Sequence, residues 1–557
     1  MTSSRIVSSG LIALALTAAA LSLPTTAGAS KRTTFLLSTA NGTFPNGPSR
    51  NAAVSHDQRD ARYIAYESDA SDIVPDDTNG TTDVFLVPRA QPFGRDGAPW
   101  LAGETELISR NTRGAPGNGP SYWPAVDGDS HHAPHCVAFV SDASDLVPGD
   151  TNGKPDGFVY DIATGRIARV SINSAGEQAN GSTYDISVSG HCMRVAFTSD
   201  ATNLALTSTA KETWSTVRTN PGRRGLRQVY VHFLGGTRAN SVFTGLTFLA
   251  SAAADGTPGN RGSGEAQIAR SGKAVVFSSA ATNLAGSDRN GALDVYRRTM
   301  VRKFRHRGHG TGVQSLQGTT GLVSATPGGR AGNGASTHPT ITDDARYVAF
   351  ETDASNLLPD DSNGVTDIVR ADLGTGRPKQ SWVSRTSIGG IGNGASDNPV
   401  ISDAGEFILF DSEATNLRPS QAVRLDPNGV RDVFLWNAPT RNVSLESRDS
   451  GNGYLRSPSQ HPATSSRGNY VPFESADPLI DLPLGQRLFP SLVEQPAALD
   501  VSLLAELSEP DLPAPELPPA AREAGFTPPA PSASVEETAA AAASVGQQVY
   551  LRYLGPK

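Results

Sequence analysis

Short apolar segments alternate with turn residues along most of the chain, and one such pattern recurs seven times. Each copy has an apolar segment of the type V-A-F and a turn rich in Ser, Asp and Asn, and most copies then have a second apolar segment of the type D-V-F-V. The V-A-F segments begin at Ile64, Val137, Val195, Val275, Val348, Ile408 and Val471. An Asn-Gly type turn precedes each copy, at Asn46, Asn118, Asn180, Asn260, Asn333, Asn393 and Asn452. A repeat of this length is typical of a fold built from stacked modules.

The apolar segments within a copy are too short for helices and are bounded by Gly, Asn, Asp and Pro. This pattern predicts four short strands per copy, with the consensus P-x-I-S for strand a, V-A-F-x-S for b, D-V-F-V for c and R-x-V-S for d. Seven four-stranded units predict an all-β, seven-bladed β-propeller. A tandem array of separate sandwiches is the alternative, but each unit is too short and too polar to form a hydrophobic core of its own.

The two ends of the chain predict how the ring closes. Residues 33–38 (TTFLLS) match strand d of the consensus, and residues 548–552 (QVYLR) match strand c. The last blade should therefore take strands a, b and c from the C-terminal part of the chain and strand d from the N-terminal part. This exchange removes the exposed sheet edges that a linear array would leave.

One repeat carries a recognisable signature. Residues 341–350 read ITDDARYVAF, and residues 367–372 read DIVRAD. These two segments resemble the TolB-like, WD-repeat-like propeller repeat, which joins an S-P-D-G-x-x-I-A-F segment to an I-Y-V-V-D strand. The resemblance covers residues 31–557 and implies a propeller. It implies no single activity, because propellers of this kind include partner-binding proteins and domains attached to enzymes.

The N-terminus predicts export. Residues 1–5 are short and positive, residues 11–23 are densely apolar, and Ala27 and Ala29 form an A-x-A site, so residues 1–29 read as a cleaved signal peptide. An uncleaved membrane anchor is the alternative. No later run is long enough to span a membrane. We expect an extracellular or cell-envelope monomer.

Two features bear on the organisation and partners of the mature chain. Its propeller would occupy residues 30–557, with a disordered insertion rich in Pro, Ala and acid at residues 484–546. The net charge of −8 does not favour a nucleic-acid partner.

The loop between strands b and c is the first candidate for chemistry. Five blades carry D-x-N-G-x-x-D there: Asp77, Asn79 and Asp83; Asp150, Asn152 and Asp156; Asp288, Asn290 and Asp294; Asp361, Asn363 and Asp367; Asp426, Asn428 and Asp432. Alternating oxygen side chains around a Gly suit a hard cation such as Ca²⁺, but each loop supplies only about three of them. An Asx-turn followed by an Asp that leads the strand is the competing interpretation.

The two cysteines form the second candidate. Cys136 follows the His-rich segment 131–135, and Cys192 follows His191 at the corresponding place in the next repeat. In an exported protein the first interpretation is a disulfide that joins two blades. Two unpaired thiols, or a Zn²⁺ or Cu²⁺ site of thiolate and imidazole, are the alternatives.

The third candidate is the start of strand a, which should surround one mouth of the central channel. The residues assigned to this position are Asn51, Trp123, Tyr184, Glu265, His338, Asn398 and His461. The seven blades differ here, and a mixture of aromatic, acidic and imidazole groups suits a polar ligand pocket. A channel mouth that tolerates any residue is the alternative.

These features favour a secreted, non-enzymatic module that binds a protein or glycan partner. Repetition without a unique catalytic constellation is the reason, and no nucleophile elbow, H-E-x-x-H, P-loop or dinucleotide fingerprint occurs. The first alternative is a metal-dependent enzyme, like propeller lyases of acidic polysaccharides, in which His338, His461 and Glu265 would converge on one cation. The second is a structural cell-surface module whose loops are stiffened by calcium.

Overall fold

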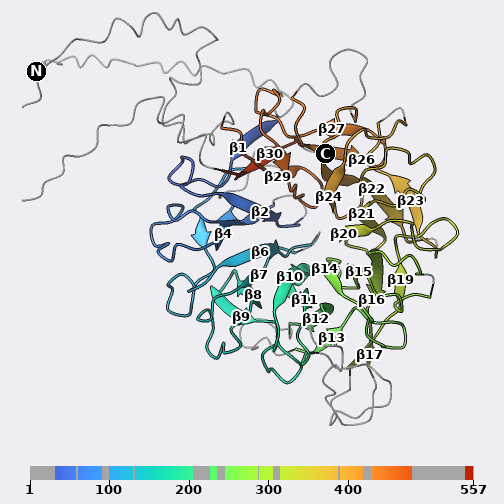
Figure 1. Cartoon of the computed structure of the whole chain (residues 1–557). Helices are drawn as coiled ribbons and strands as arrows, with labels where there is room; N and C mark the ends of the chain where they lie inside the picture. The colour runs from blue at the N-terminus through green and yellow to red at the C-terminus, as the bar shows by residue number, and fades with distance from the viewer. Residues whose placement is uncertain are drawn as a thin grey trace, which may run out of the picture.

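Seven four-stranded antiparallel sheets are arranged around a central axis (Figure 1). The computed structural model describes residues 32–57, 61–90, 100–129, 132–204, 226–234, 245–286, 288–304, 314–374, 376–386, 389–417, 428–478 and 546–555. The predicted signal peptide and residues 484–545 of the predicted insertion lie outside these ranges. The described residues include no helix with the length and hydropathy that a membrane span needs.

Each blade follows the predicted order a, b, c, d from the axis outwards. Blade 1 contains β2 (Ser49–Val54), β3 (Tyr63–Ser68), β4 (Asp83–Pro88) and β5 (Glu106–Leu107). Blade 2 contains β6 (Ser121–Val126), β7 (Cys136–Ser141), β8 (Asp156–Asp161) and β9 (Arg166–Arg169). Blade 3 contains β10 (Thr183–Val188), β11 (Arg194–Ser199), β12 (Gln228–Phe233) and β13 (Thr247–Leu249), with a 3-10 turn, η1 (Gly190–Cys192), between its first two strands.

Blade 4 is the only one of the described sheets with an added hairpin. It contains β14 (Ser263–Ile268), β15 (Ala274–Ser279), β16 (Asp294–Thr299) and β19 (Thr320–Leu322), and β17 (Val301–Phe304) pairs with β18 (Gln314–Gln317) between its last two strands. Blade 5 contains β20 (Ser336–Ile341), β21 (Tyr347–Thr352), β22 (Asp367–Asp372) and β23 (Lys379–Trp382). Blade 6 contains β24 (Ser396–Ile401), β25 (Phe407–Ser412), β26 (Asp432–Asn437) and β27 (Val443–Leu445).

Blade 7 confirms the predicted closure of the ring. It contains β28 (Ser459–Gln460), β29 (Tyr470–Ser475), β30 (Gln548–Tyr553) and the N-terminal β1 (Thr33–Leu36), which lies beside β30 in Figure 1. Thr33 pairs with Tyr553, and Leu36 pairs with Tyr550. The buried Arg552 donates hydrogen bonds to Thr34 Oγ1 and to the carbonyl of Arg448, which secures this closure to blade 6.

The core explains why the V-A-F and D-V-F-V segments recur. In six of the seven blades an aromatic residue of strand b stacks on one of strand c, as in Phe139 on Phe158 with ring centroids 5.9 Å apart. Blade 5 has Phe350 opposite Val369 instead. These side chains are buried between adjacent blades, so each sheet uses its neighbour to complete its core.

Candidate functional site

The b–c loops are held by their own side chains. In blade 1, Asn79 Nδ2 donates to Asp83 Oδ2 (2.7 Å) and to the carbonyl of Gly117 (2.9 Å), while Asn79 Oδ1 accepts from the amide of Thr81. Ser109 Oγ of the d strand region donates to Asp83 Oδ1 (2.5 Å). The Asn and the second Asp of the motif therefore tie the b–c loop to strand d and the d–a connection.

The same arrangement recurs in the other four blades. The second Asp accepts from a Ser hydroxyl in each case, with the pairs Asp156 and Ser171, Asp294 and Ser324, Asp367 and Ser384, and Asp432 and Ser447. The matching Asn side chains donate to a carbonyl of the following connection: Asn152 to Ala179, Asn290 to Gly332, Asn363 to Gly392 and Asn428 to Leu455. Asp426 lies outside the described residues. Burial raises the pKa of Asp83, Asp294 and Asp367 to about 6.

The first Asp of the motif differs between blades. In blade 2, Gln178 Nε2 donates to both Asp150 Oδ1 (2.8 Å) and Asp156 Oδ2 (2.9 Å), so one nitrogen lies between two carboxylates. In blade 1, Asp77 is 6% exposed, and no described residue donates an ordinary hydrogen bond to either of its oxygens, although the amide of Asn79 faces it. In blade 4, Asp288 Oδ1 is likewise buried without such a donor among the described residues, and Tyr296 donates to Asp288 Oδ2. Asp361 in blade 5 is half-buried.

The two cysteines are joined. A disulfide connects Cys136, at the start of β7, to Cys192, at the end of η1, and so links the a–b loops of blades 2 and 3. His132, His135 and His191 gather beside it, with the rings of His132 and His191 3.4 Å apart between centroids. The thiols are thereby removed from the zinc or copper site considered from the sequence, whereas the imidazoles remain.

The predicted ring at the start of strand a is present, with one correction. Five of its members occupy the third position of their strands: Asn51, Trp123, Glu265, His338 and Asn398. The sixth, His461, directly follows the two residues of β28. In blade 3 this position belongs to Asp185, not to Tyr184. Tyr184 lines the same cavity, one residue before this position. Blade 3 has Ile186 where four of the seven blades have Pro. Its bulge also falls one residue earlier, between Thr183 and Asp185.

These six residues share an unusual backbone conformation. Their φ angles lie between 45° and 57°, in the left-handed region that side chains other than Gly rarely adopt. Five of them, all except His461, mark a bulge where strand a shifts register against strand b. Such strained positions persist only where their surroundings hold them, and they gather at ligand sites.

A carboxylate of the preceding blade holds each of these residues. The backbone amide of Trp123 donates to Glu67 Oε2 (2.7 Å), and that of His338 donates to Glu265 Oε2 (2.8 Å). The remaining pairs are Asn51 with Glu474, Glu265 with Asp185, Asn398 with Glu351, and His461 with Asp411. We call these six contacts the carboxylate latches. In blade 2 the corresponding strand-b residue is Val140, which has no acceptor for blade 3, and Asp185 has no left-handed conformation.

The latch carboxylates also set the charge of the channel mouth. His338 Nδ1 lies 2.5 Å from Glu351 Oε1, and its Nε2 lies 3.6 Å from Glu265 Oε1. The hydrogen bond to Glu351 raises the pKa of His338 to about 9, so this half-exposed imidazole is cationic at neutral pH. His461 Nδ1 lies 2.9 Å from Glu474 Oε2, and this contact raises the pKa of His461 as well.

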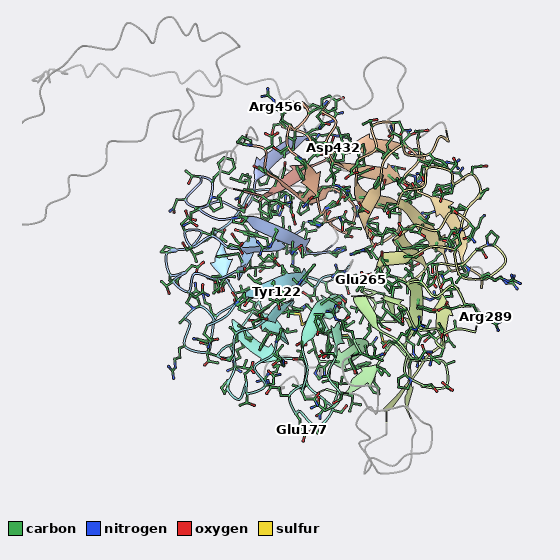
Figure 2. All side chains as sticks on the ribbon, viewed as in Figure 1. Tyr122, Glu177, Glu265, Arg289, Asp432 and Arg456 are labelled. Carbon is green, nitrogen blue, oxygen red and sulfur yellow. A yellow bond between two sulfur atoms is a disulfide. The ribbon has the colours of Figure 1, made fainter. Side chains whose placement is uncertain are left out.

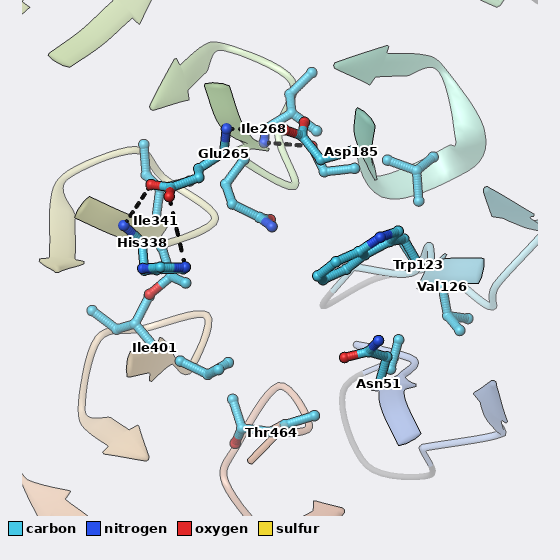
Figure 3. A pocket seen from close by; sticks show the side chains of 18 of the residues that line it. Asn51, Trp123, Val126, Asp185, Glu265, Ile268, His338, Ile341, Ile401 and Thr464 are labelled. Atoms are coloured by element: carbon cyan, nitrogen blue, oxygen red, sulfur yellow. Dashed lines mark hydrogen bonds and ion pairs between the residues drawn. The ribbon is translucent and has the colours of Figure 1, made fainter. Parts of the chain in front are cut away.

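The ring opens into a cavity of about 520 Å³ that follows the central channel. Glu265 lies near the axis, whereas Glu177 and Arg289 lie at the periphery (Figure 2). In Figure 3 the indole of Trp123 reaches into the opening, with Asn51, Glu265 and His338 around it. Below this polar ring the walls are mostly apolar and include Val126, Ile268 and Ile401.

The opposite end of the cavity is lined by charged residues that no sequence pattern distinguishes. His56 Nδ1 of blade 1 lies 2.6 Å from Asp403 Oδ1 of blade 6. Arg270 of blade 4 donates to the carbonyl of Val126 in blade 2 (2.8 Å). Burial lowers the pKa of both Arg270 and His56. These contacts cross between blades that are not neighbours, and they narrow the channel at the a–b end.

The enzyme alternative required His338, His461 and Glu265 to converge on one cation. The only group of three candidate metal ligands with donor atoms within 4.8 Å of one another, among the described residues, is Asp129, His132 and His191. His338 and His461 instead contact carboxylates of the latches: His338 contacts Glu265 and Glu351, and His461 contacts Glu474.

No protein-family model matches this chain, and no curated protein matches it. Solved structures resemble it at a distance. TolB from Acinetobacter baumannii is 15% identical over 69% of this chain and 62% of its own length, with a TM-score of 0.32. An oligogalacturonate lyase from Vibrio parahaemolyticus is 10% identical over 78% of this chain and 89% of its own, with a TM-score of 0.40. A puromycin-hydrolysing peptidase from Mycobacterium tuberculosis is 9% identical over 82% and 54%, with a TM-score of 0.40. The chain is thus a seven-bladed β-propeller with distant structural similarity to TolB and to the propellers of peptidases and a lyase.

Proposed function

We propose that this chain is an exported binding module that takes a glycan segment at the channel mouth. The observation that carries the proposal is Trp123, a large aromatic side chain that is 49% exposed and directed into the opening of a 520 Å³ cavity. Exposed aromatic side chains at the mouth of a cavity are characteristic of binding surfaces, because covering them with a ligand removes apolar surface from water, which lowers the free energy.

The groups around Trp123 favour a sugar over an apolar ligand. An aromatic face packs against the C–H face of a pyranose, and the hydroxyl groups at its edge need donors and acceptors. Asn51 and Asn398 supply amides, His338 supplies a charged donor, and Glu265 supplies an acceptor. The latches hold all of these on strained but fixed backbone, which lowers the ordering cost of binding.

The test is calorimetric titration of the full chain with a panel of neutral and acidic oligosaccharides. Trp123→Ala should weaken the best ligand at least tenfold, whereas Trp382→Ala, which removes an indole from strand β23, should leave its affinity unchanged. Equal affinity of wild type and Trp123→Ala would overturn the proposal. Failure of every saccharide, together with binding of a protein partner that Trp123→Ala abolishes, would reassign the mouth to a peptide.

A second proposal concerns calcium in the b–c loops. Its support is the comparison of blades 1 and 2: Gln178 supplies a nitrogen between Asp150 and Asp156, whereas Pro116 stands at the equivalent point of blade 1 and has no donor for Asp77. A hard cation would satisfy the buried Asp77 carboxylate there. Calcium should raise the melting temperature of wild type more than that of Asp77→Asn. An identical shift in both, or none in wild type, would reject a calcium-stiffened scaffold.

A further inference from the structure

The a–b loops of blades 2 and 3 bring three potential metal ligands together, on residues that the proposed glycan site does not use. Asp129 and His132 lie in the loop between β6 and β7, and His191 lies in η1 between β10 and β11. One donor atom from each lies within 4.8 Å of the other two. His132 Nδ1 is 2.8 Å from Asp129 Oδ1 and 3.0 Å from Asp129 Oδ2.

From this juxtaposition we infer a site for a divalent transition-metal ion, with Zn²⁺ as the reference ion. Two imidazole nitrogens and one carboxylate oxygen form a donor set that Zn²⁺, Cu²⁺ and Ni²⁺ accept and that Ca²⁺, which prefers oxygen, does not. The site is separate from the channel mouth, so the inference is independent of the proposed function.

The disulfide is the feature that holds this arrangement. Cys192 directly follows His191 in the chain, and its partner Cys136 anchors the other loop at the start of β7. His191 and Cys192 have φ angles of 63° and 49°, so the chain turns back sharply between them. The cross-link fixes the distance between two loops of different blades, which preorganises ligands that are 59 residues apart in sequence (His132 to His191).

The surrounding groups suit a cation. Asp127 is fully buried beneath the loop and accepts hydrogen bonds from the amides of His135 and Cys136, at 2.6 and 3.0 Å. Its Oδ2 lies 3.6 Å from His135 Nδ1. Arg270 also interacts electrostatically with Asp129. The site thus has two carboxylates, one of them a direct ligand.

The accessibility of the ligands indicates an open coordination sphere. The side chain of His132 is 45% exposed and that of Asp129 is 17% exposed. Three protein ligands leave at least one position of a tetrahedral ion for water or for a donor from outside. The site therefore has the composition of a metal centre that can also bind an external group, rather than of a closed structural one.

Metal content and affinity test this inference. Wild type, purified with its disulfide intact, should bind one equivalent of Zn²⁺ in a calorimetric titration. His132→Ala and His191→Ala should each weaken it on the order of 100-fold, since even the hydrogen-bond partners of metal ligands are worth 10- to 100-fold. His132 is exposed, so its variant should fold even if the left-handed His191 tolerates no change. Zn²⁺ should also raise the melting temperature of wild type and not that of His132→Ala.

The matched control is His461→Ala, which removes an imidazole from the channel mouth. It should keep the wild-type stoichiometry and affinity. Loss of Zn²⁺ binding in His461→Ala, with binding retained in His132→Ala and His191→Ala, would place the ion at the channel mouth and overturn the inference. The absence of stoichiometric Zn²⁺ binding by wild type would overturn it too. Cys136→Ser with Cys192→Ser should weaken Zn²⁺ binding without adding or removing a ligand; unchanged affinity would contradict the preorganising role of the disulfide.

Discussion

The latch between blades 1 and 2 gives the sharpest test of how the channel mouth is held. Glu67 is 2% exposed; its Oε2 accepts from the amide of Trp123, and its Oε1 accepts from Arg50 Nε at 2.8 Å. Hydrogen bonds to charged groups contribute about 1.5–3 kcal/mol each. Two such bonds, offset in part by the cost of burying the carboxylate, give about 3 kcal/mol for Glu67→Ala.

Urea unfolding of the full chain, followed by tryptophan fluorescence, measures this change in the free energy of unfolding. Asp69→Ala is the matched control, because Asp69 accepts from the same Arg50 at 2.9 Å but is 38% exposed and does not reach Trp123. An exposed ion pair contributes about 0–1 kcal/mol. Glu67→Gln, which retains an acceptor for the amide, should lie between the two. If Glu67→Ala costs no more than Asp69→Ala, the latches do not stabilise the bulges and the reasoning fails.

Three further predictions concern charge and closure. The pKa of His338 is raised to about 9, so the stabilisation from its pairing with Glu351 is complete below about pH 6.5 and is lost as pH rises through 9. Wild type should therefore lose about 1 kcal/mol more than His338→Asn between pH 7 and 10, a small value because the imidazole is half-exposed; parallel pH profiles from thermal melts would contradict it. Replacing both cysteines by serine should cost about 4 kcal/mol, because the disulfide closes a loop of 56 residues, and an unchanged urea midpoint would deny the cross-link a stabilising role. Arg552→Met should lower the free energy of unfolding by about 3–5 kcal/mol, because the buried Glu446 loses its ion pair with this arginine. Arg456→Met is the surface control, and equal melting temperatures of the two variants would show that the closure does not depend on Arg552.

The repeat pattern was enough to predict the blades, because apolar strands and Gly/Asn turns obey local rules that do not depend on distant residues. It was not enough to find the latches. Glu67, Glu351 and Glu474 are the next-to-last residues of strand b in their blades, and their side chains are buried in the assembled ring. Their equivalents Thr198 and Ser278 carry no charge, and the acid comes from strand a instead, as Asp185 and Glu265.

The side chains near the axis show the same limit. The sequence places Tyr184 in the ring, and Tyr184 does line the cavity, but the third position of strand a belongs to Asp185, because the position of a bulge is set by pairing with the next strand. Arg270 and Asp403 occupy loops with no distinguishing pattern, and their contacts cross the axis between blades far apart in sequence. The strands can therefore be located from the local sequence. The contacts between side chains of different blades can be identified only in the assembled ring.

The closure of blade 7 has a consequence for the order of assembly. Thr33 pairs with Tyr553, so the first strand of the propeller cannot complete its sheet until the last one has been made. During synthesis or export, β1 stays unpaired while the other six blades form an open ring. Contacts this distant in sequence are the slowest to form. Residues 476–547 connect β29 to β30, and a single cut there would leave β30 held between β1 and β29 by hydrogen bonds and packing alone. The ring could then persist as two polypeptides, joined in the one blade that the chain itself enters from both ends.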